Sequence, residues 1–196
     1  MTPRRRFTRE ELESFRDATV PDLVGPELRL LFVGINPGLW TAATNTHFAH
    51  PGNRFYPALL RGGVIRRAID PAAGMADDDR THLIGLGVGI TNIAPRATAR
   101  ASELSRDELR VGARDLVTRV GEWTPAVVAI AGITAYRVGF ERPRAQTGRQ
   151  AEPLGGAELW IVPNPSGLNA HQTVTTLAAA YRRVAKAAGI KVAGDT

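Results

Sequence analysis

The stretch Leu28-Arg-Leu-Leu-Phe-Val-Gly-Ile-Asn-Pro-Gly38 decides the fold. Residues 28–33 form a compact apolar run rich in branched side chains, as expected of a β-strand covered on both faces. The run ends in Gly34-Ile-Asn-Pro-Gly38, where proline and glycine force a turn. A buried strand of this kind predicts a parallel sheet, in which ligands bind at the carboxyl ends of the strands.

Further strands are expected at the apolar runs 87–93, 126–131 and 158–162. Helices are expected at the capping boxes Thr8–Glu11 and Ser105–Glu108, from Asn53 to Arg61, and over 174–188 before Gly189. The helix after Ser105 places one apolar face at Leu109, Ala113, Leu116, Val117 and Val120. Segments 70–80 and 141–157 are predicted to be connections. This alternation predicts an α/β protein, a three-layer α/β/α sandwich with a mostly parallel central sheet.

Composition bounds the class of protein. With 196 residues, 43% of them hydrophobic, the chain suits one domain, which we place at 27–190. A basic extension with a short helix at 1–26 precedes it and a tail at 191–196 follows. Lys+Arg 25 against Asp+Glu 19 gives a net charge of +6, which favours polyanionic partners. The chain has no cysteine, which excludes disulfides, thiolate zinc sites, iron–sulfur clusters and a cysteine nucleophile.

No membrane segment or signal peptide is expected. The longest apolar stretch, residues 126–133, is too short to cross a bilayer, and no apolar segment follows the basic start of the chain. We therefore expect a soluble cytoplasmic protein.

The first loop carries one chemically useful side chain, Asn36. Its amide can orient a water molecule but is no general base near neutral pH. Gly34 and Gly38 permit close backbone approach and unusual dihedral angles, and Pro37 stiffens the loop. The alternative is a structural asparagine that satisfies the backbone of its own turn.

The loop after the last expected strand is Pro163-Asn-Pro-Ser-Gly-Leu-Asn169. Two prolines and a glycine fix its path, and Ser166 offers a hydroxyl to a phosphate. Leu168 is suited to act as a wedge pushed into a base stack, the alternative being a leucine folded into the core.

A third segment, residues 46–56, interleaves aromatic residues with His47, His50 and Arg54. An exposed ring there could stack on a base, whereas Phe55 and Tyr56 fit a core with His50 and Arg54 as internal hydrogen-bonders. No metal is expected, because neither cysteine nor a nearby carboxylate completes a site. The acidic run 77–79 is interpreted as solvated surface, the alternative being that one carboxylate assists a catalytic water.

Three ordered motifs resemble the mismatch-specific uracil/thymine-DNA glycosylases, a branch of the uracil-DNA glycosylase superfamily. They are Gly-Ile-Asn-Pro-Gly at 34–38, Phe48-Ala-His-Pro with Asn53-Arg-Phe55 downstream, and Asn-Pro-Ser-Gly-Leu at 164–168. The resemblance spans about residues 28–187. The absence of cysteine excludes the iron–sulfur branches, and Asn-Pro rather than His-Pro in the second loop argues against the single-strand-selective branch.

The resemblance implies a monofunctional DNA glycosylase of base excision repair, which flips uracil out opposite guanine and hydrolyses its N-glycosidic bond. It also admits thymine or other damaged pyrimidines. Asn36 would hold the attacking water, and Asn164 takes the place of a histidine in other branches. Residues expected to bind the base are Gly34, Ile35, Pro37, Gly38 and Phe48. Residues expected to bind DNA are Ser166, Gly167, the wedge Leu168, and Asn169.

The expected partner is double-stranded DNA containing uracil or a mismatch, bound by a monomer without metal or cofactor. The family often has serine and arginine after the wedge, where this chain has Asn169 and Ala170, so weaker guanine recognition is expected. Two alternatives remain, a single-strand-selective-type uracil-DNA glycosylase and a non-catalytic module that binds damaged DNA. A nucleotide-binding protein is disfavoured, because residues 34–38 lack a phosphate-loop lysine and the dinucleotide fingerprint.

Overall fold

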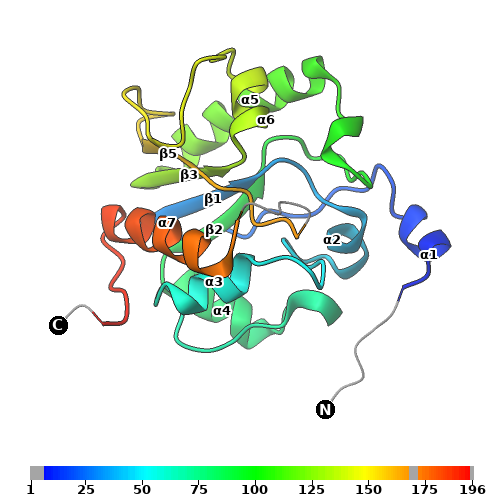
Figure 1. Ribbon diagram of the computed structural model, residues 1–196, viewed down its shortest axis with the longest axis horizontal. Helices are drawn as coiled ribbons and strands as arrows, with labels where there is room; N and C mark the ends of the chain where they lie inside the picture. The colour runs from blue at the N-terminus through cyan, green and yellow to red at the C-terminus, as the bar shows by residue number, and fades with distance from the viewer. Residues whose placement is uncertain (1–6, 168–171, 195–196) are drawn as a thin grey trace.

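A five-stranded sheet forms the centre of the computed structural model, which describes residues 7–167 and 172–194 (Figure 1). Its strands follow the order β2-β1-β3-β5-β4, and the first four run parallel to one another. The short β4 is antiparallel at one edge. The strands are β1 (Leu30–Gly34), β2 (Val88–Asn92), β3 (Val127–Ala131), β4 (Gly148–Arg149) and β5 (Glu158–Val162).

Three strands, β1, β2 and β3, are buried along their full length, which explains their continuous apolar sequences. In β1, β2 and β3 every residue is buried. The strands are in register, with Leu30 opposite both Val88 and Val127, so their carboxyl ends lie at one edge of the sheet. The predicted strands at 28–33, 87–93, 126–131 and 158–162 are therefore confirmed, with bounds that shift by up to two residues.

Helices cover both faces of this sheet. They are α1 (Arg9–Glu13), α2 (Leu39–Thr44), α3 (Phe55–Arg61), α4 (Asp77–Gly85), α5 (Arg106–Trp123), α6 (Ile133–Gly139) and α7 (Val174–Ala187), with 3₁₀ turns η1 (Pro71–Ala73) and η2 (Ala101–Glu103). Figure 1 shows α5 and α6 on one side of the sheet and α3, α4 and α7 on the other.

Two apolar cores separate the three layers. Alternate side chains of β1 point into opposite cores, Leu30 and Phe32 toward α3 and α7, Leu31 and Val33 toward α5 and α6. This is the predicted three-layer α/β/α sandwich with a mostly parallel sheet.

The predicted capping boxes are present. Thr8 and Glu11 bond reciprocally at the start of α1, and Ser105 and Glu108 do so at the start of α5. Along α5 the predicted apolar face is buried except for Val117, which is 40% exposed. Beyond α7, Gly189 has a φ of 70°, the left-handed conformation that ends helices.

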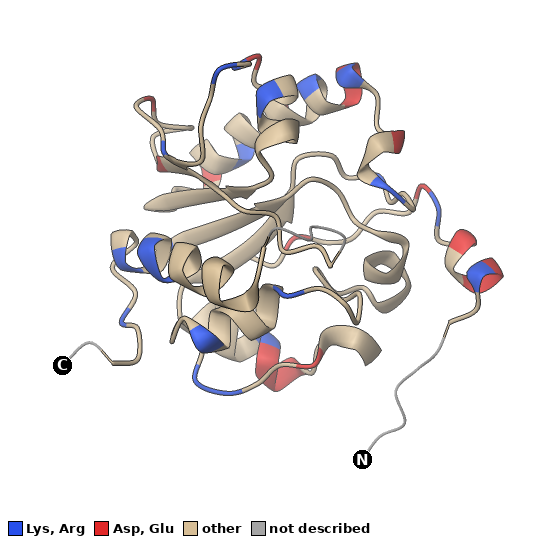
Figure 2. Cartoon of the chain, viewed as in Figure 1, with Lys and Arg blue, Asp and Glu red and all other residues tan. Residues whose placement is uncertain are grey.

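Two segments predicted to be connections contain regular structure. Residues 70–80 hold η1 and the first turn of α4, because Pro71 suits the start of a helical turn and three aspartates favour the positive end of a helix dipole. Residues 141–157 hold β4. Figure 2 shows the acidic run at the start of α4, while Lys and Arg occupy helices of both layers.

The segment before β1 is hydrogen-bonded to the rest of the protein. Backbone bonds join Asp17 and Ala18 to Ala97, and Leu23 pairs with Ile90 of β2. The division into an extension at 1–26, a domain at 27–190 and a tail at 191–196 stays a prediction. Among the described residues, no helix has both the length and the apolar character needed to span a membrane.

Candidate active site

The two predicted loops meet at the carboxyl edge of the sheet. One follows β1 and the other follows β5, and between them Gly132 follows β3. A Cβ atom on Gly132 would lie 3.2 Å from Cδ1 of Ile35 and 3.7 Å from Nδ2 of Asn164. Its φ of 145° also favours glycine. The two loops therefore lie on either side of a residue that leaves room for both.

The aromatic segment joins the same cluster. The backbone N–H of Arg54 donates to the carbonyl oxygen of Pro165 at 3.0 Å. Gly167 packs so closely that an added Cβ would lie 2.6 Å from the carbonyl oxygen of Gly52. All three sequence motifs are thus brought together, including the described DNA-binding candidates Ser166 and Gly167. Leu168 and Asn169 lie outside the described residues.

Gly34 and Gly38 serve different purposes. A Cβ on Gly34 would lie 2.4 Å from Oδ1 of Asn92 and 3.5 Å from the Phe48 ring, so this position has no room for a side chain. Gly38 has an ordinary φ of −76° and caps α2, and a Cβ there would meet nothing within 4 Å. The expected close approach therefore holds at Gly34, and the expected unusual dihedral angle is wrong at Gly38. Pro37 between them is buried.

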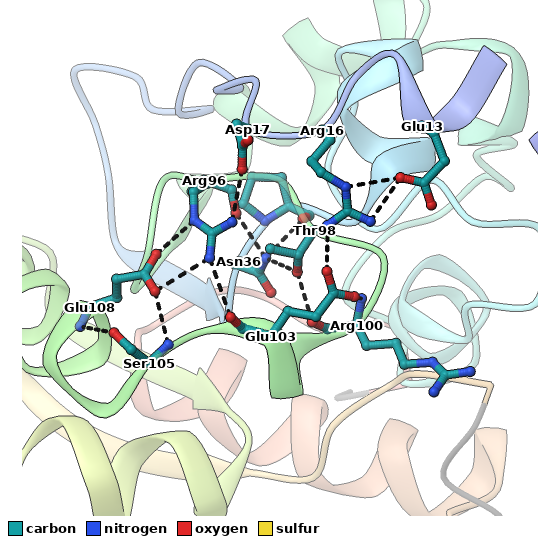
Figure 3. Close-up of polar contacts among 11 residues, drawn as sticks. Glu13, Arg16, Asp17, Asn36, Arg96, Thr98, Arg100, Glu103, Ser105 and Glu108 are labelled. Atoms are coloured by element: carbon teal, nitrogen blue, oxygen red, sulfur yellow. Dashed lines mark hydrogen bonds and ion pairs between the residues drawn. The ribbon is translucent and has the colours of Figure 1, made fainter. Parts of the chain in front are cut away.

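Asn36 is half-buried, and its amide nitrogen is fully used. Nδ2 donates to the carbonyl oxygen of Arg96 at 2.8 Å, to Oγ1 of Thr98 at 2.8 Å and to the carbonyl oxygen of Pro37 at 3.1 Å (Figure 3). Within residues 7–167 and 172–194, these contacts of Asn36 involve no carboxylate. The bonds reach beyond its own turn, into the loop that follows β2.

Asn164 organises the second loop. Its Oδ1 accepts a hydrogen bond of 2.9 Å from the backbone N–H of Ser166, an Asx turn. Its Nδ2 lies beside Gly132, 3.7 Å from the position that a Cβ would take there. An amide group on the β5 side thus lies across Gly132 from the loop that carries Asn36.

Phe48 offers an aromatic surface beside Gly34. It is half-buried, with its ring stacked on Phe55 at a centroid distance of 4.1 Å and an interplanar angle of 24°. Its backbone has a φ of 56°, a strained conformation for a bulky residue and one that clusters at functional sites. The core role predicted for Phe55 and Tyr56 is confirmed, with exposures of 0% and 2%.

The histidines of this segment serve internal contacts. His47 bonds through Nε2 to the carbonyl oxygen of Pro21 and through Nδ1 to Nδ2 of Asn92. Burial lowers the pKa of His47, so the ring is neutral at pH 7. His50 accepts from the backbone N–H of Gly52 but is exposed, so its predicted internal place is wrong, whereas the half-buried Arg54 donates to two carbonyl oxygens as predicted.

Asn92 is a site residue that the sequence reasoning missed. It ends β2, is only 8% exposed, and its Oδ1 lies against Gly34. A buried amide therefore lies beside the loop that carries Asn36. The available signal was a polar Thr91-Asn92 pair inside an otherwise apolar run.

The acidic run 77–79 belongs to α4. Asp77 and Asp78 are exposed in its first turn, and Asp79 pairs with Arg67 at 2.9 Å. A helix N-terminus and a neighbouring cation account for these charges.

The loop after β2 is tied down by ion pairs. Arg96 bonds through Nε to Glu108 at 2.7 Å and through Nη1 to Asp17 at 2.8 Å (Figure 3). The hydrogen bond from Arg96 is the main cause that lowers the pKa of Glu108 from 4.5 to about 2, and the backbone N–H of Ser105 is the second.

We expect Glu108→Gln to lower the free energy of unfolding at pH 7 and to matter less at pH 3. A carboxylate whose folded pKa is depressed stabilises the protein above its unfolded pKa. That contribution is lost as the pH falls from about 4.5 through about 2. Urea unfolding at both pH values measures the effect, with Asp115→Asn on the exposed face of α5 as control. An equal deficit at pH 3 and pH 7 would contradict the assignment.

Comparison with known proteins agrees with this geometry. The solution NMR structure of a protein from Methanosarcina acetivorans, described as a candidate uracil DNA glycosylase, superposes with a TM-score of 0.58 at 15% identity. The match covers 85% of this chain and 96% of that one, and it shows a shared fold. The family model of the Uracil DNA glycosylase superfamily matches residues 21–186, which include every described motif residue. The chain therefore belongs to the uracil DNA glycosylase superfamily.

Proposed function

We propose that this protein is a monofunctional DNA glycosylase that removes uracil from guanine mismatches in double-stranded DNA. One observation carries the proposal: the loops that carry the neutral amides Asn36 and Asn164 lie on either side of Gly132, at the ligand-binding edge of a parallel sheet. Superfamily membership supports hydrolysis of an N-glycosidic bond.

The chemistry needs three tasks from these residues. The flipped uracil stacks on the half-buried Phe48 ring, held by backbone groups around Ile35. Oδ1 of Asn36 accepts a hydrogen bond from a water and directs its lone pair at the anomeric carbon. As the C–O bond forms and the C–N bond breaks, negative charge grows on the departing uracil, and the amide N–H of Asn164 stabilises it. The proton of the attacking water passes to solvent.

The proposed site is a modest catalyst, because both its side-chain groups are uncharged. Among the described residues, the neighbouring His47 is neutral and committed to Pro21 and Asn92. Rate enhancement then depends on positioning and fixed dipoles. Loss of one hydrogen-bond donor in such a site lowers the rate about a hundred- to a thousandfold.

Alkaline cleavage of a labelled uracil:guanine duplex after incubation with the protein tests the activity. We expect strand breaks with uracil:guanine and fewer with uracil:adenine, with thymine:guanine run alongside. Equal or faster cleavage of single-stranded uracil DNA would favour the single-strand-selective type. Salt-dependent binding without strand breaks would leave a damage-binding module.

The wedge assignment concerns Leu168, which lies outside the described residues. Its loop is secured at both described ends by Arg54, which donates to the carbonyl oxygens of Gly167 at 3.3 Å and Gln172 at 2.7 Å. A loop held this way is suited to push an apolar side chain into a base stack.

For Leu168→Ala we expect about a tenfold loss of affinity for an abasic-site duplex and faster product release. The reason is that alanine is too small to fill the gap between the unstacked base pairs. Fluorescence anisotropy gives the affinity and multiple-turnover kinetics give the release rate. Leu60→Ala, at an exposed leucine of α3, is the matched control. Unchanged abasic-site affinity in Leu168→Ala would remove the wedge.

A further inference from the structure

The orientation of the Asn36 amide is set by the loop that follows β2. An amide nitrogen carries two hydrogens, so the 2.8 Å contacts to Arg96 and Thr98 use them and the 3.1 Å contact to Pro37 shares one. Two of these three acceptors are carbonyl oxygens. Turning the amide over would bring Oδ1 against two oxygens, so this side-chain orientation is strongly preferred. The amide oxygen consequently points away from the loop (Figure 3).

Thr98 is committed to the same orientation. Its hydroxyl donates to the carbonyl oxygen of Arg100 at 2.8 Å, so its lone pair is what faces Nδ2 of Asn36. The residue is 1% exposed, and its backbone N–H donates to Pro37 at 3.1 Å. Thr98 therefore fixes Asn36 through its side chain and the Asn36 turn through its backbone.

Arg96 holds the loop from outside. Its guanidinium bonds to Glu108 on α5, to Asp17 before β1 and to the carbonyl oxygen of Glu103. Its carbonyl oxygen, on the same residue, accepts from Asn36. A planar guanidinium with several fixed partners places that carbonyl more precisely than a single contact would.

We propose that Thr98 and Arg96 are positioning residues that hold the amide of Asn36 with Oδ1 turned toward the attacking water. The inference rests on the proposed function, since it needs Asn36 to orient that water. It assigns a catalytic consequence to a loop that touches neither base nor DNA in the proposed mechanism.

The first test compares Thr98→Val with Thr98→Ser. We expect Val, which keeps the shape but accepts no hydrogen bond, to lower the single-turnover rate of uracil release about tenfold. Serine should restore the rate to within about twofold, because it keeps the hydroxyl. Affinity for an abasic-site duplex should be unchanged in both, and thermal denaturation should show both to be folded. An unchanged rate in Thr98→Val overturns the inference.

A double-mutant cycle separates positioning from a general structural effect. In an Asn36→Ala background, Thr98→Val should change the residual rate by less than about twofold, since no amide remains to be oriented. A full tenfold loss in that background would mean that Thr98 acts independently of Asn36, which overturns the inference and leaves the proposed function standing. A wild-type protein that releases no uracil overturns both.

Arg96→Met extends the test to the outer contacts. We expect about a threefold lower rate that also disappears in the Asn36→Ala background, since partly exposed ion pairs contribute modestly. Arg110→Met is the matched control, because Arg110 has a similar side-chain exposure, 37% against 32%, and pairs with Asp107 and Glu141 elsewhere on the surface. Equal losses in both variants, or a loss that persists without the Asn36 amide, overturn the role of Arg96.

Discussion

Asn36→Ala is expected to lower the rate of uracil release about a hundred- to a thousandfold, while affinity for a uracil-containing duplex changes little. The amide oxygen is the proposed acceptor for the attacking water, and a methyl group cannot direct that water at the sugar. Duplex affinity should persist, because phosphate and base contacts come from other residues. Single-turnover cleavage and fluorescence anisotropy measure the two quantities separately.

Asn36→Asp distinguishes positioning from simple basicity. A carboxylate is the stronger base, yet it has no hydrogen to donate to the carbonyl oxygens of Arg96 and Pro37, which lie 2.8 and 3.1 Å from Nδ2. We expect this variant to stay at least about tenfold below wild type, because a charged oxygen would face two carbonyl oxygens. Full activity in Asn36→Ala would eliminate the assignment of Asn36. An Asn36→Asp variant faster than wild type would show that basicity outweighs orientation.

Gly112→Ala is expected to reduce the free energy of unfolding by about 3 kcal/mol. Gly112 lies on the buried side of α5, and a Cβ there would be 2.3 Å from the carbonyl oxygen of Ile93 and 2.9 Å from its carbonyl carbon. Backbone atoms cannot swing aside as a side chain can, so helix and loop must separate. Urea unfolding measures the loss.

Gly121→Ala on the same helix is the control, because a Cβ there would meet nothing within 4 Å. Alanine in an exposed helical position should add about 0.5–1 kcal/mol of stability. Equal effects at both positions would show that the close contact between α5 and Ile93 does not occur in solution. A wild-type stability for Gly112→Ala would do the same.

Strands and long helices were predictable where a local sequence pattern, an apolar run or a capping box, indicated one kind of element and no other. The apolar runs of β1 and β3 have a length and composition that suit a doubly covered strand, and Ser105 with Glu108 starts α5 through contacts three residues apart. The short helices α2 and α6 were not predictable. Their N-cap residues, Gly38 and Gly132, have no side chain, so neither helix carries a capping signal.

The loops of the candidate site were predictable, but the contacts that orient their side chains were not. Asn36 and Asn164 stand out because prolines and glycines surround them within a few residues. The contacts that orient Asn36 come from Arg96 and Thr98, 60 and 62 residues away in the chain. Asn92 was hidden for a related reason, since its partners Gly34 and His47 become neighbours only when the sheet forms. Pairings between distant segments depend on topology, which local patterns do not encode.

Because β1 lies inside the sheet and β5 lies next to its edge, the two strands differ in how readily their backbone hydrogen bonds open. Hydrogen bonds run along both edges of β1, whereas β5 has a two-residue strand as its outer neighbour. Amide hydrogens of β1 should therefore exchange with solvent only when the whole domain unfolds, and those at the end of β5 through smaller, more frequent excursions. The loop after β5 can thus be remodelled by substitution without loosening the anchorage of the loop after β1.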